Sequence, residues 1–244
     1  MRLTRILIDL DLRQGDSFPL PDQAHHHLIR VLRLREGQPF IAFDGHSDQE
    51  ALAEITMIEK RQAFARIQSI TAVQRESPLQ LTLVQAISAS DKMDITLQKS
   101  VELGVQEIIP VYSERSQHRM KAAQIEKKIR HWQGVIIHAT EQSGRTRLAR
   151  LHTPLPLTEH LDQRATDTTA IVLDPAATMT PRQLRRPIDK LEIHVGPEGG
   201  FTTAEIAMMD ASNIGRLRLG PRILRTETAG IALIAWLQAE LGDF

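Results

Sequence analysis

The sequence of 244 residues contains no cysteine, so disulfide bonds, thiolate metal sites and cysteine nucleophiles are excluded. It also has no apolar run close to the roughly 20 residues that a membrane span needs. At its N-terminus, charged residues interrupt the apolar ones and no cleavage-site pattern occurs. We therefore expect a soluble, cytoplasmic protein. Aromatic residues make up only 4% of the chain, and Trp132 and Trp236 lie at helical core spacing, which favours packing over stacking on bases.

Several nucleotide-binding and metal-binding motifs are missing as well. The chain has no GxGxxG, GxxxxGKS/T or HExxH pattern, which argues against a Rossmann-type dinucleotide pocket, a P-loop nucleotidase and a zinc protease. Three consecutive histidines, His25, His26 and His27, would point about 100° apart on a helix and cannot converge on one ion. We therefore expect no metal.

The formal net charge is zero, but the charges are unevenly distributed. Residues 1–74 carry nine Lys and Arg against ten Asp and Glu, so this segment has no overall attraction for phosphate. Residues 112–150 carry nine against three. Such an excess is typical of a surface that faces phosphate and, equally, of a solvated helix face.

The polar segment 74–78 divides the chain into two regions with different secondary-structure patterns. Before it, short alternating runs and a turn at 44–48 predict a mainly β module, with strands over 39–43, 50–58 and 62–70 and one helix over 24–34. After it, strands alternate with helices, which predicts a parallel sheet; the strands cover 79–87, 107–112, 170–173, 191–195 and 217–219, and the helices 92–103, 121–140 and 228–241. Because the last helix is apolar on most faces, we expect it to pack against several elements or against a second copy of the chain.

Two glycine-containing loops near the C-terminus are the most informative feature. GPEGGF at 196–201 follows one predicted strand, and LGPRILRTETA at 219–229 follows the next. Glycine permits positive φ angles and the close approach of a ligand. Open α/β sheets bind ligands at the carboxyl ends of their strands. The two loops therefore predict one ligand cradle, which also carries Arg222 and Arg225.

These loops, with HLIRVLR at 27–33, QKSVELGV at 98–105 and EQSGR at 141–145, resemble the RsmE family of bacterial 16S ribosomal RNA methyltransferases, members of the SPOUT superfamily. The resemblance covers nearly the whole chain, and the two loops are its specific part. It implies an α/β protein with two domains. Residues 1–74 would form a PUA-like, RNA-binding β-barrel. Residues 75–244 would form a SPOUT methyltransferase domain with a parallel sheet, a C-terminal trefoil knot and a homodimer interface that includes the last helix.

The resemblance also implies a reaction on the small ribosomal subunit. S-adenosylmethionine (SAM) would donate a methyl group to N3 of a uridine near the 3′ end of 16S rRNA, position 1498 in the usual rRNA numbering. The cofactor pocket implied by the family comprises Leu173, Gly196, Pro197, Glu198, Gly200, Leu219, Gly220, Ile223, Leu224, Thr226 and Ala229.

N3 of uridine carries a proton, so the enzyme must remove it or stabilise the anion. An arginine near the uracil carbonyls would stabilise the developing charge. Arg225 in the second loop is the first candidate, and Arg115 could reach the pocket of a dimer partner. Glu141 and Glu198 are the candidate bases, and Glu141 serves equally well as a salt-bridge partner.

The predicted RNA-binding residues come from the basic segment and are Arg119, Lys127, Lys128, Arg130, Arg145 and Arg147. Three other functions stay open. One is ribose 2′-O methylation of RNA by an enzyme of the same superfamily. The β module and the RILRTETA segment favour N3 methylation over this alternative. The others are a non-catalytic RNA-binding factor in ribosome assembly and a small-molecule enzyme that uses GPEGGF as a phosphate loop.

Overall fold

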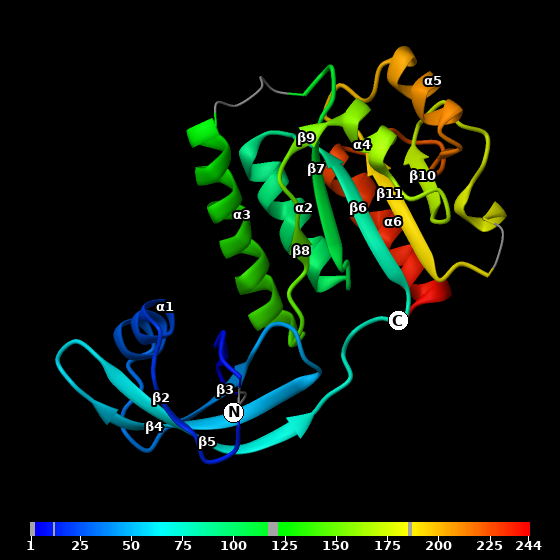
Figure 1. The fold of residues 1–244 in the computed structure, drawn as a ribbon. Coiled ribbons are helices and arrows are strands. Elements are labelled where there is room, and N and C mark those ends of the chain that lie inside the picture. Colours follow the sequence, from blue (N-terminus) through cyan, green and yellow to red (C-terminus); the bar gives the residue numbers. More distant parts are fainter. Residues whose placement is uncertain (1–2, 12, 117–121, 185–186) are drawn as a thin grey trace. The chain divides into compact units, whose positions relative to one another are not determined.

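The structure is a computed structural model that describes residues 3–11, 13–116, 122–184 and 187–244. The chain forms two compact units (Figure 1). The first comprises Met1–Glu76 and Thr140–Leu148, and the second Ser77–Ala139 and Ala149–Phe244. The short segment 140–148 thus belongs to the first unit, although it lies more than 60 residues after the polar segment 74–78 that separates the two predicted domains.

The first unit is built on a five-stranded sheet in the order β1-β3-β4-β5-β2. Its strands are β1 (Arg5–Leu7), β2 (Ser17–Pro19), β3 (Pro39–Phe43), β4 (Gln49–Ile58) and β5 (Ala63–Ala72). β3, β4 and β5 correspond to the three predicted strands and form an antiparallel meander, and β1 pairs in parallel with β3. Alternate residues of β4 and β5 are buried in one core, as the period of two in a strand requires: Ala51, Ala53, Ile55, Ala63, Ala65 and Ile67.

The predicted helix of this unit is present but has two parts. α1 (Asp22–His25) continues as the π-helical turn η1 (His26–Val31), which ends before the expected Leu34. Leu28 is fully buried in the core, whereas Val31, Leu32 and Arg33 are exposed. The periodicity of a sequence cannot distinguish a π-turn from an α-turn, since both bury the same central residue.

An ion pair ties segment 140–148 to the rest of the first unit. Arg145 is 4% exposed and donates to the carboxylate of Glu76 at 2.5 to 3.2 Å, while Arg5 donates to the carbonyl of Arg145 at 2.9 Å. Arg147 lies at the surface and pairs with Asp48 at 2.7 and 2.8 Å. The expectation that Arg145 binds RNA is therefore corrected, because its guanidinium is buried and already neutralised.

The second unit contains a parallel sheet in the order β12-β10-β11-β6-β7-β8, with β9 also paired to β7. The strands are β6 (Gln80–Ala86), β7 (Glu107–Tyr112), β8 (Arg150–Leu151), β9 (Leu155–Pro156), β10 (Thr169–Leu173), β11 (Lys190–Val195) and β12 (Gly215–Leu217). All of their pairings are parallel, which confirms the predicted sheet. The strand expected over 217–219 ends at Leu217, so Leu219 lies in the following loop.

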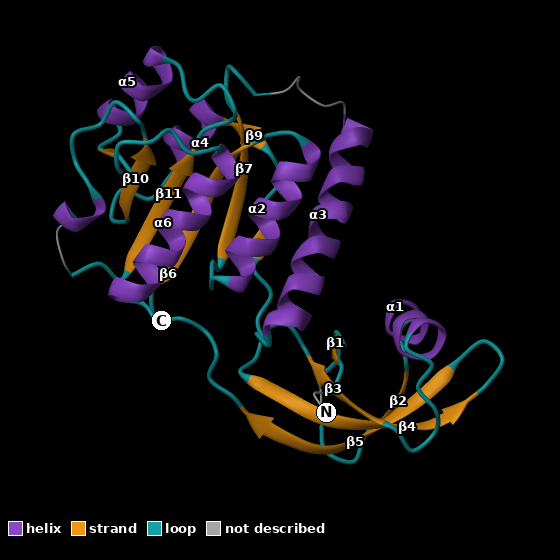
Figure 2. Ribbon diagram, turned by 180° about the vertical axis from the view of Figure 1, so that it is seen from behind, coloured by secondary structure: helices purple, strands orange, loops and turns teal. Residues whose placement is uncertain are grey.

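The helices of this unit are α2 (Ser90–Glu102), α3 (Ala122–Ser143), whose last four residues belong to the first unit, α4 (Leu157–Gln163), α5 (Thr203–Ala211) and α6 (Thr226–Leu241). α2 and α6 cover one face of the sheet, and α4 lies on the other (Figures 1 and 2). Among the helices of the described ranges, none has the length and apolar character that crossing a membrane requires. Trp132 of α3 is 1% exposed, which confirms its expected role in packing.

α6 packs against both α2 and β11, as expected of an apolar helix. Its buried residues include Gly230, Leu233, Ile234 and Leu237. A Cβ at Gly230 would lie 3.4 Å from Val195, so glycine lets the helix approach the strand closely. Trp236 is only partly buried, so one side of α6 keeps apolar surface accessible within the single chain.

Replacing Arg145 by alanine should destabilise the protein by about 3 to 5 kcal/mol, because it leaves the carboxylate of Glu76 without its cation in a largely buried position. The matched change Arg147→Ala removes an exposed pair that solvent screens, so it should cost far less. Urea unfolding followed by circular dichroism measures both. Equal losses would contradict the structural role of Arg145.

Candidate functional site

A cavity of about 510 Å³ lies at the carboxyl ends of β10, β11 and β12. These strands are neighbours and run in parallel, so the loops that follow Leu173, Val195 and Leu217 meet at one edge of the sheet. Its walls are mainly apolar, and its volume falls in the range of small-ligand sites. The cavity lies where the two glycine loops predict a ligand cradle.

Ten of the eleven predicted cofactor residues line this cavity: Leu173, Gly196, Pro197, Glu198, Gly200, Leu219, Ile223, Leu224, Thr226 and Ala229. Gly220 does not; it has a φ of +86° and no atom near the position of a Cβ, so it is a turn residue. The structure adds lining residues that the sequence reasoning missed, namely Lys92, Asp174, Pro175, Ala176, Phe201 and Arg218. Asp174 to Ala176 directly follow the predicted strand 170–173, and this position at the carboxyl end of a strand could have indicated that they line the site.

A hydrogen-bonded chain joins the two glycine loops. The hydroxyl of Thr226 donates to the carbonyl of Gly196 at 2.5 Å, and the amide of Gln85 donates to that hydroxyl at 3.3 Å. A Cβ at Gly196 would lie only 3.2 Å from Phe201, so the loop has little room for a larger residue there. Gly200 has a φ of +67°, which favours glycine. These contacts fix the two walls of the cavity relative to each other.

Glu198 holds the first loop to the start of α2. Its carboxylate accepts from the amide of Ala89 at 3.0 Å and pairs with Lys92 at 3.3 Å. Partial burial raises the pKa of Glu198, but these hydrogen bonds and the Lys92 ammonium outweigh burial and lower the pKa overall. A carboxylate with a lowered pKa is a weak general base near neutral pH.

Three exposed arginines, Arg218, Arg222 and Arg225, stand on the rim of the cavity. No carboxylate of the described residues pairs with any of them, whereas Arg216 nearby is paired with Asp174 at 2.6 Å. The rim is therefore positively charged and suits an anionic ligand or polymer. Arg115 donates to the carbonyl of Gly199 at 2.8 Å, so the structure places it on the first loop of its own chain.

Glu141 does not line the cavity. Its carboxylate accepts from the backbone amide of Leu7 at 3.1 Å, within the first unit. This contact is a backbone hydrogen bond rather than the salt bridge that was expected as the alternative, and the role of Glu141 as a base stays a prediction.

The basic segment offers less free charge than its sequence indicates. Lys127 and Arg130 of α3 are exposed, although Arg130 is 3.9 Å from Glu126. Lys128 donates to the hydroxyl of Ser90. Arg119 lies outside the described residues. Together with the pairing of Arg145 and Arg147, this leaves a small part of the predicted RNA surface uncompensated.

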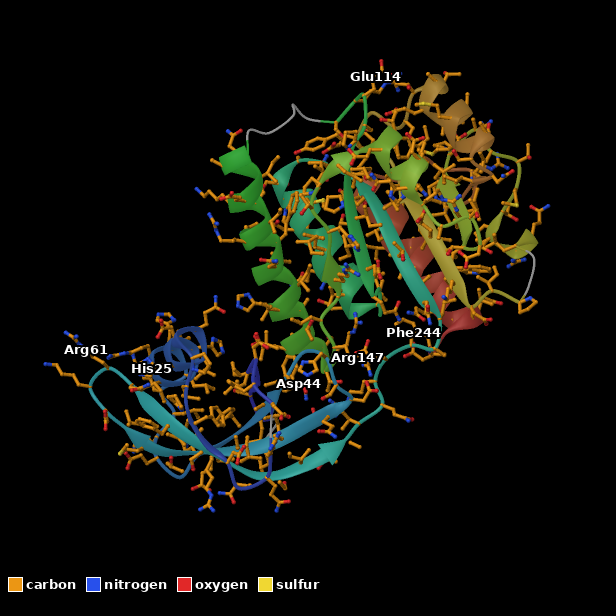
Figure 3. The ribbon with its side chains drawn as sticks, viewed as in Figure 1. His25, Asp44, Arg61, Glu114, Arg147 and Phe244 are labelled. Carbon is orange, nitrogen blue, oxygen red and sulfur yellow. The ribbon has the colours of Figure 1, made fainter. Side chains whose placement is uncertain are left out.

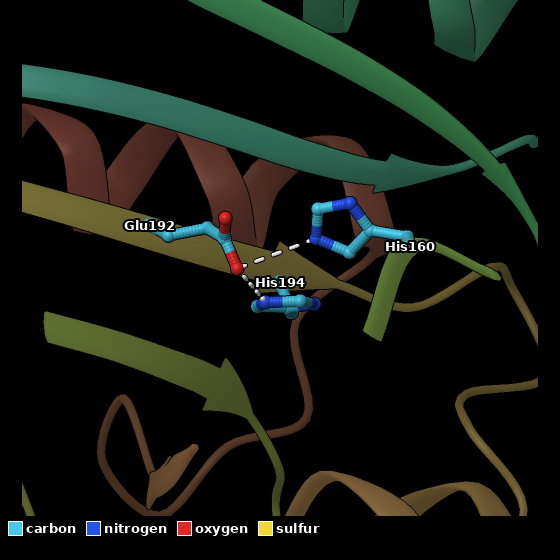
Figure 4. Close-up of side chains that lie close together, drawn as sticks. All are labelled: His160, Glu192 and His194. Atoms are coloured by element: carbon cyan, nitrogen blue, oxygen red, sulfur yellow. Dashed lines mark hydrogen bonds and ion pairs between the residues drawn. The ribbon is translucent and has the colours of Figure 1, made fainter. Parts of the chain in front are cut away.

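A buried cluster in the second unit has the residue types of a metal site (Figure 4). One oxygen of Glu192 accepts from His194 at 2.6 Å and from His160 at 3.3 Å, and the candidate ligand atoms lie within 4.8 Å of one another. Arg164 donates to the same oxygen at 3.3 Å. Because this guanidinium already supplies the positive charge, the cluster fits a hydrogen-bonded network that ties α4 to β11 better than a cation site.

Comparison with protein families finds two matches. Residues 75–238 match the RNA methyltransferase domain, and residues 20–68 match the RNA methyltransferase PUA domain. The chain is 32% identical to ribosomal RNA small subunit methyltransferase E of Buchnera aphidicola from Acyrthosiphon pisum, with 100% of this chain and 96% of the relative covered. The same enzyme from the Schizaphis graminum strain is 34% identical, with 99% and 98% covered.

Two solved structures are similar over their whole length. A putative methyltransferase of Legionella pneumophila, in complex with the cofactor SAM, has a TM-score of 0.95 at 37% identity, with 100% of both chains covered. Ribosomal RNA small subunit methyltransferase E of Neisseria gonorrhoeae, bound to SAM, has a TM-score of 0.93, also at 37% identity with 100% of both chains covered.

The buried cluster predicts a loss of stability in acid. Burial lowers the pKa of His194 below its ordinary 6.5, while the hydrogen bonds from His160 and His194 overcome burial and lower the pKa of Glu192 below 4.5. A group whose pKa is depressed on folding stabilises the fold above its unfolded pKa and loses this contribution as pH falls. The free energy of unfolding should therefore decrease below about pH 6.5, and further below about pH 4.5.

Urea unfolding at a series of pH values measures this dependence. His194→Gln should flatten the first decrease, whereas the exposed His138→Gln should leave it unchanged. A decrease that persists unaltered in His194→Gln would assign the pH dependence to another group.

Proposed function

Because the chain belongs to the ribosomal RNA small subunit methyltransferase E (RsmE) family, we propose that it methylates N3 of a uridine in 16S rRNA on the small ribosomal subunit, with SAM as methyl donor. The observation that carries the proposal is the cavity at the ends of β10, β11 and β12, which the Thr226–Gly196 hydrogen bond closes on one side and an unpaired arginine rim borders on the other. The proposed target is position 1498 in the usual rRNA numbering.

The residues of the cavity fit SAM. SAM supplies an electrophilic methyl group. Leu173, Leu219, Leu224 and Phe201 offer apolar walls of the kind that an adenine ring needs, and the glycines of the first loop leave its backbone accessible for hydrogen bonds to the ring edge. The volume of about 510 Å³ is sufficient for a ligand of this size.

For the uracil we propose a role for Arg225. It precedes α6 on the rim, is exposed and has no carboxylate partner among the described residues. Its guanidinium would stabilise negative charge on a uracil carbonyl as N3 loses its proton. The two acids that line the cavity are engaged in other contacts, Glu198 with Ala89 and Lys92, and Asp174 with Arg216. We therefore propose that the proton passes to solvent rather than to either of these carboxylates.

The knot and the dimer are part of the proposal. α6 follows the edge strand β12, yet it packs against β11 and α2, so the chain crosses back over the sheet after β12, as a trefoil knot requires. Apolar side chains left accessible on the same unit, Ile95 at 45% and Ile223 at 85%, together with the part-exposed side of α6, favour a homodimer. Residues 1–74 would supply RNA binding, in the cytoplasm where ribosomes assemble.

The direct test is methyl transfer from labelled SAM to small subunits that lack the modification, followed by nucleoside digestion and mass spectrometry. We expect 3-methyluridine. Label on a ribose would replace the N3 assignment with 2′-O methylation, and SAM binding without transfer to any small subunit or free RNA would favour a binding factor.

Arg225→Ala should lower kcat by roughly 10²- to 10³-fold, because it removes a cation that stabilises charge mainly in the transition state. SAM affinity should change little, which isothermal titration measures. Arg222→Ala, three residues earlier on the rim, should mainly raise KM for RNA. If both variants change only KM, Arg225 binds RNA and has no part in the chemistry.

If no side-chain base is involved, kcat of the wild-type protein should rise with pH up to the pKa of the uracil N3 proton. A bell-shaped profile with an acidic limb in the carboxylate range would point to a base, and Glu198→Gln would then abolish that limb.

A further inference from the structure

We propose that a groove on the first unit, between η1 and the turn that joins β4 to β5, binds an unpaired segment of the substrate RNA. The inference deepens the proposed function and rests on RNA being the substrate. It assigns a specific face to a unit whose sequence showed no overall attraction for phosphate.

The groove has a volume of about 540 Å³. Ile29 and Ile58, both partly buried, provide its apolar surface. The polar lining comes from His25 and Arg30 on one side and from Lys60 and Arg61 on the other, with Glu59 beside them. Arg30 donates to the carbonyl of Lys60 at 3.3 Å, so the two sides are held together. Figure 3 shows His25 and Arg61 at this end of the first unit.

Some acids of the unit are paired with cations outside the groove. Glu50 pairs with Arg5 and Arg75, and Asp48 pairs with Arg147. Glu36 accepts from the amide of the groove residue Ile58, so it leaves a carboxylate beside the groove. The groove itself has three cations against one carboxylate, with Arg33 and Arg35 exposed just beyond it. A unit with twelve basic and twelve acidic residues thus presents a local positive patch, which attracts a phosphate backbone.

Exposed apolar side chains that neighbour the groove residues in sequence favour unpaired nucleotides over a duplex. Val31 is 55% exposed, Leu32 42% and Met57 42%. Bases that are free of pairing can lay their faces on apolar side chains while their phosphates meet the arginines and lysine. In a duplex the base faces are stacked on one another and are not available to such a surface.

The backbone at this position is unusual and supports a functional role. η1 is a π-helical turn, and Arg33 adopts a φ of +57°, a left-handed conformation that is strained for a residue with a side chain. The amide of Leu34 donates to the carbonyl of Leu28 at 2.9 Å and closes the turn. π-turns and strained residues gather at functional sites. Here they coincide with the exposed segment Val31–Arg33.

The test is the affinity of the full-length protein for a fluorescent single-stranded RNA with the sequence around the target uridine, measured at several salt concentrations. The double variant Lys60→Ala/Arg61→Ala should bind at least tenfold more weakly. It should also reduce the slope of log K against log salt by about 1.4, since each phosphate contact to a single strand contributes about 0.7. Affinity for SAM should stay unchanged, which shows that the second unit is folded, and an unchanged circular dichroism spectrum shows the same for the first.

Arg13→Ala/Arg66→Ala is the matched control. It removes the same charge from the same unit, but Arg13 is bound to Asp11 and Arg66 to the carbonyl of Gly15, outside the groove. Leu32→Ser should weaken binding without changing the salt slope, because it removes only apolar contact. The wild-type slope in Lys60→Ala/Arg61→Ala, or an equal reduction in the control, would overturn the proposal.

The assay separates this inference from the proposed function. If the wild-type protein methylates small subunits but the groove variants bind RNA normally, the groove is wrong and the methyltransferase assignment stands. If groove variants bind free RNA normally yet lose binding to small subunits, the partner of the groove is a ribosomal protein, and the RNA assignment fails. If the wild-type protein transfers no methyl group although the groove variants lose RNA binding, the proposed function fails and the groove stands.

Discussion

The parallel alignment of β10, β11 and β12 is the constraint on which the site depends. Neighbouring parallel strands end at the same edge of the sheet, so three loops far apart in sequence meet around one cavity. Hydrogen bonds then set the shape of the loops, from Thr226 to Gly196 and from Ala89 to Glu198. The apolar packing of α6 on α2 and β11 keeps Thr226 in place, so the buried core and the polar network support the same site.

Local patterns in the sequence were sufficient for the longer strands of the sheet and for most of the residues that line the cavity, but they missed the two-residue strands β8 and β9. The strands that became β6, β7, β10 and β11 are apolar runs of ordinary length, and glycine with proline marks the loops after two of the site's strands. The end of β12 was misplaced because Leu219 continues the alternation of apolar and basic residues that starts before Leu217, although its backbone has already left the sheet. β1 and β2 were missed because strands of three residues carry too short an alternation to detect.

Long-range pairing was beyond local patterns. Arg145 and Glu76 are 69 positions apart, and Glu141 meets the amide of Leu7 across 134 positions. In the sequence, Arg145 and Glu141 lie in the basic segment 112–150. A basic segment that also contains a carboxylate is equally typical of an RNA-binding surface or of a catalytic site. Whether a charged side chain is free or paired depends on the fold, and the same reasoning explains why a neutral first unit concentrates positive charge in one groove.

The division of the chain into units has a consequence for modularity. The first unit takes Thr140–Leu148 from the interior of the second half of the sequence, and the buried Arg145 belongs to it. A fragment cut after the polar segment 74–78 would lose this guanidinium and the contact of Glu141 with β1. The first unit therefore cannot be transferred as one continuous segment of the sequence. Excision or recombination at a single boundary would remove part of its own interior.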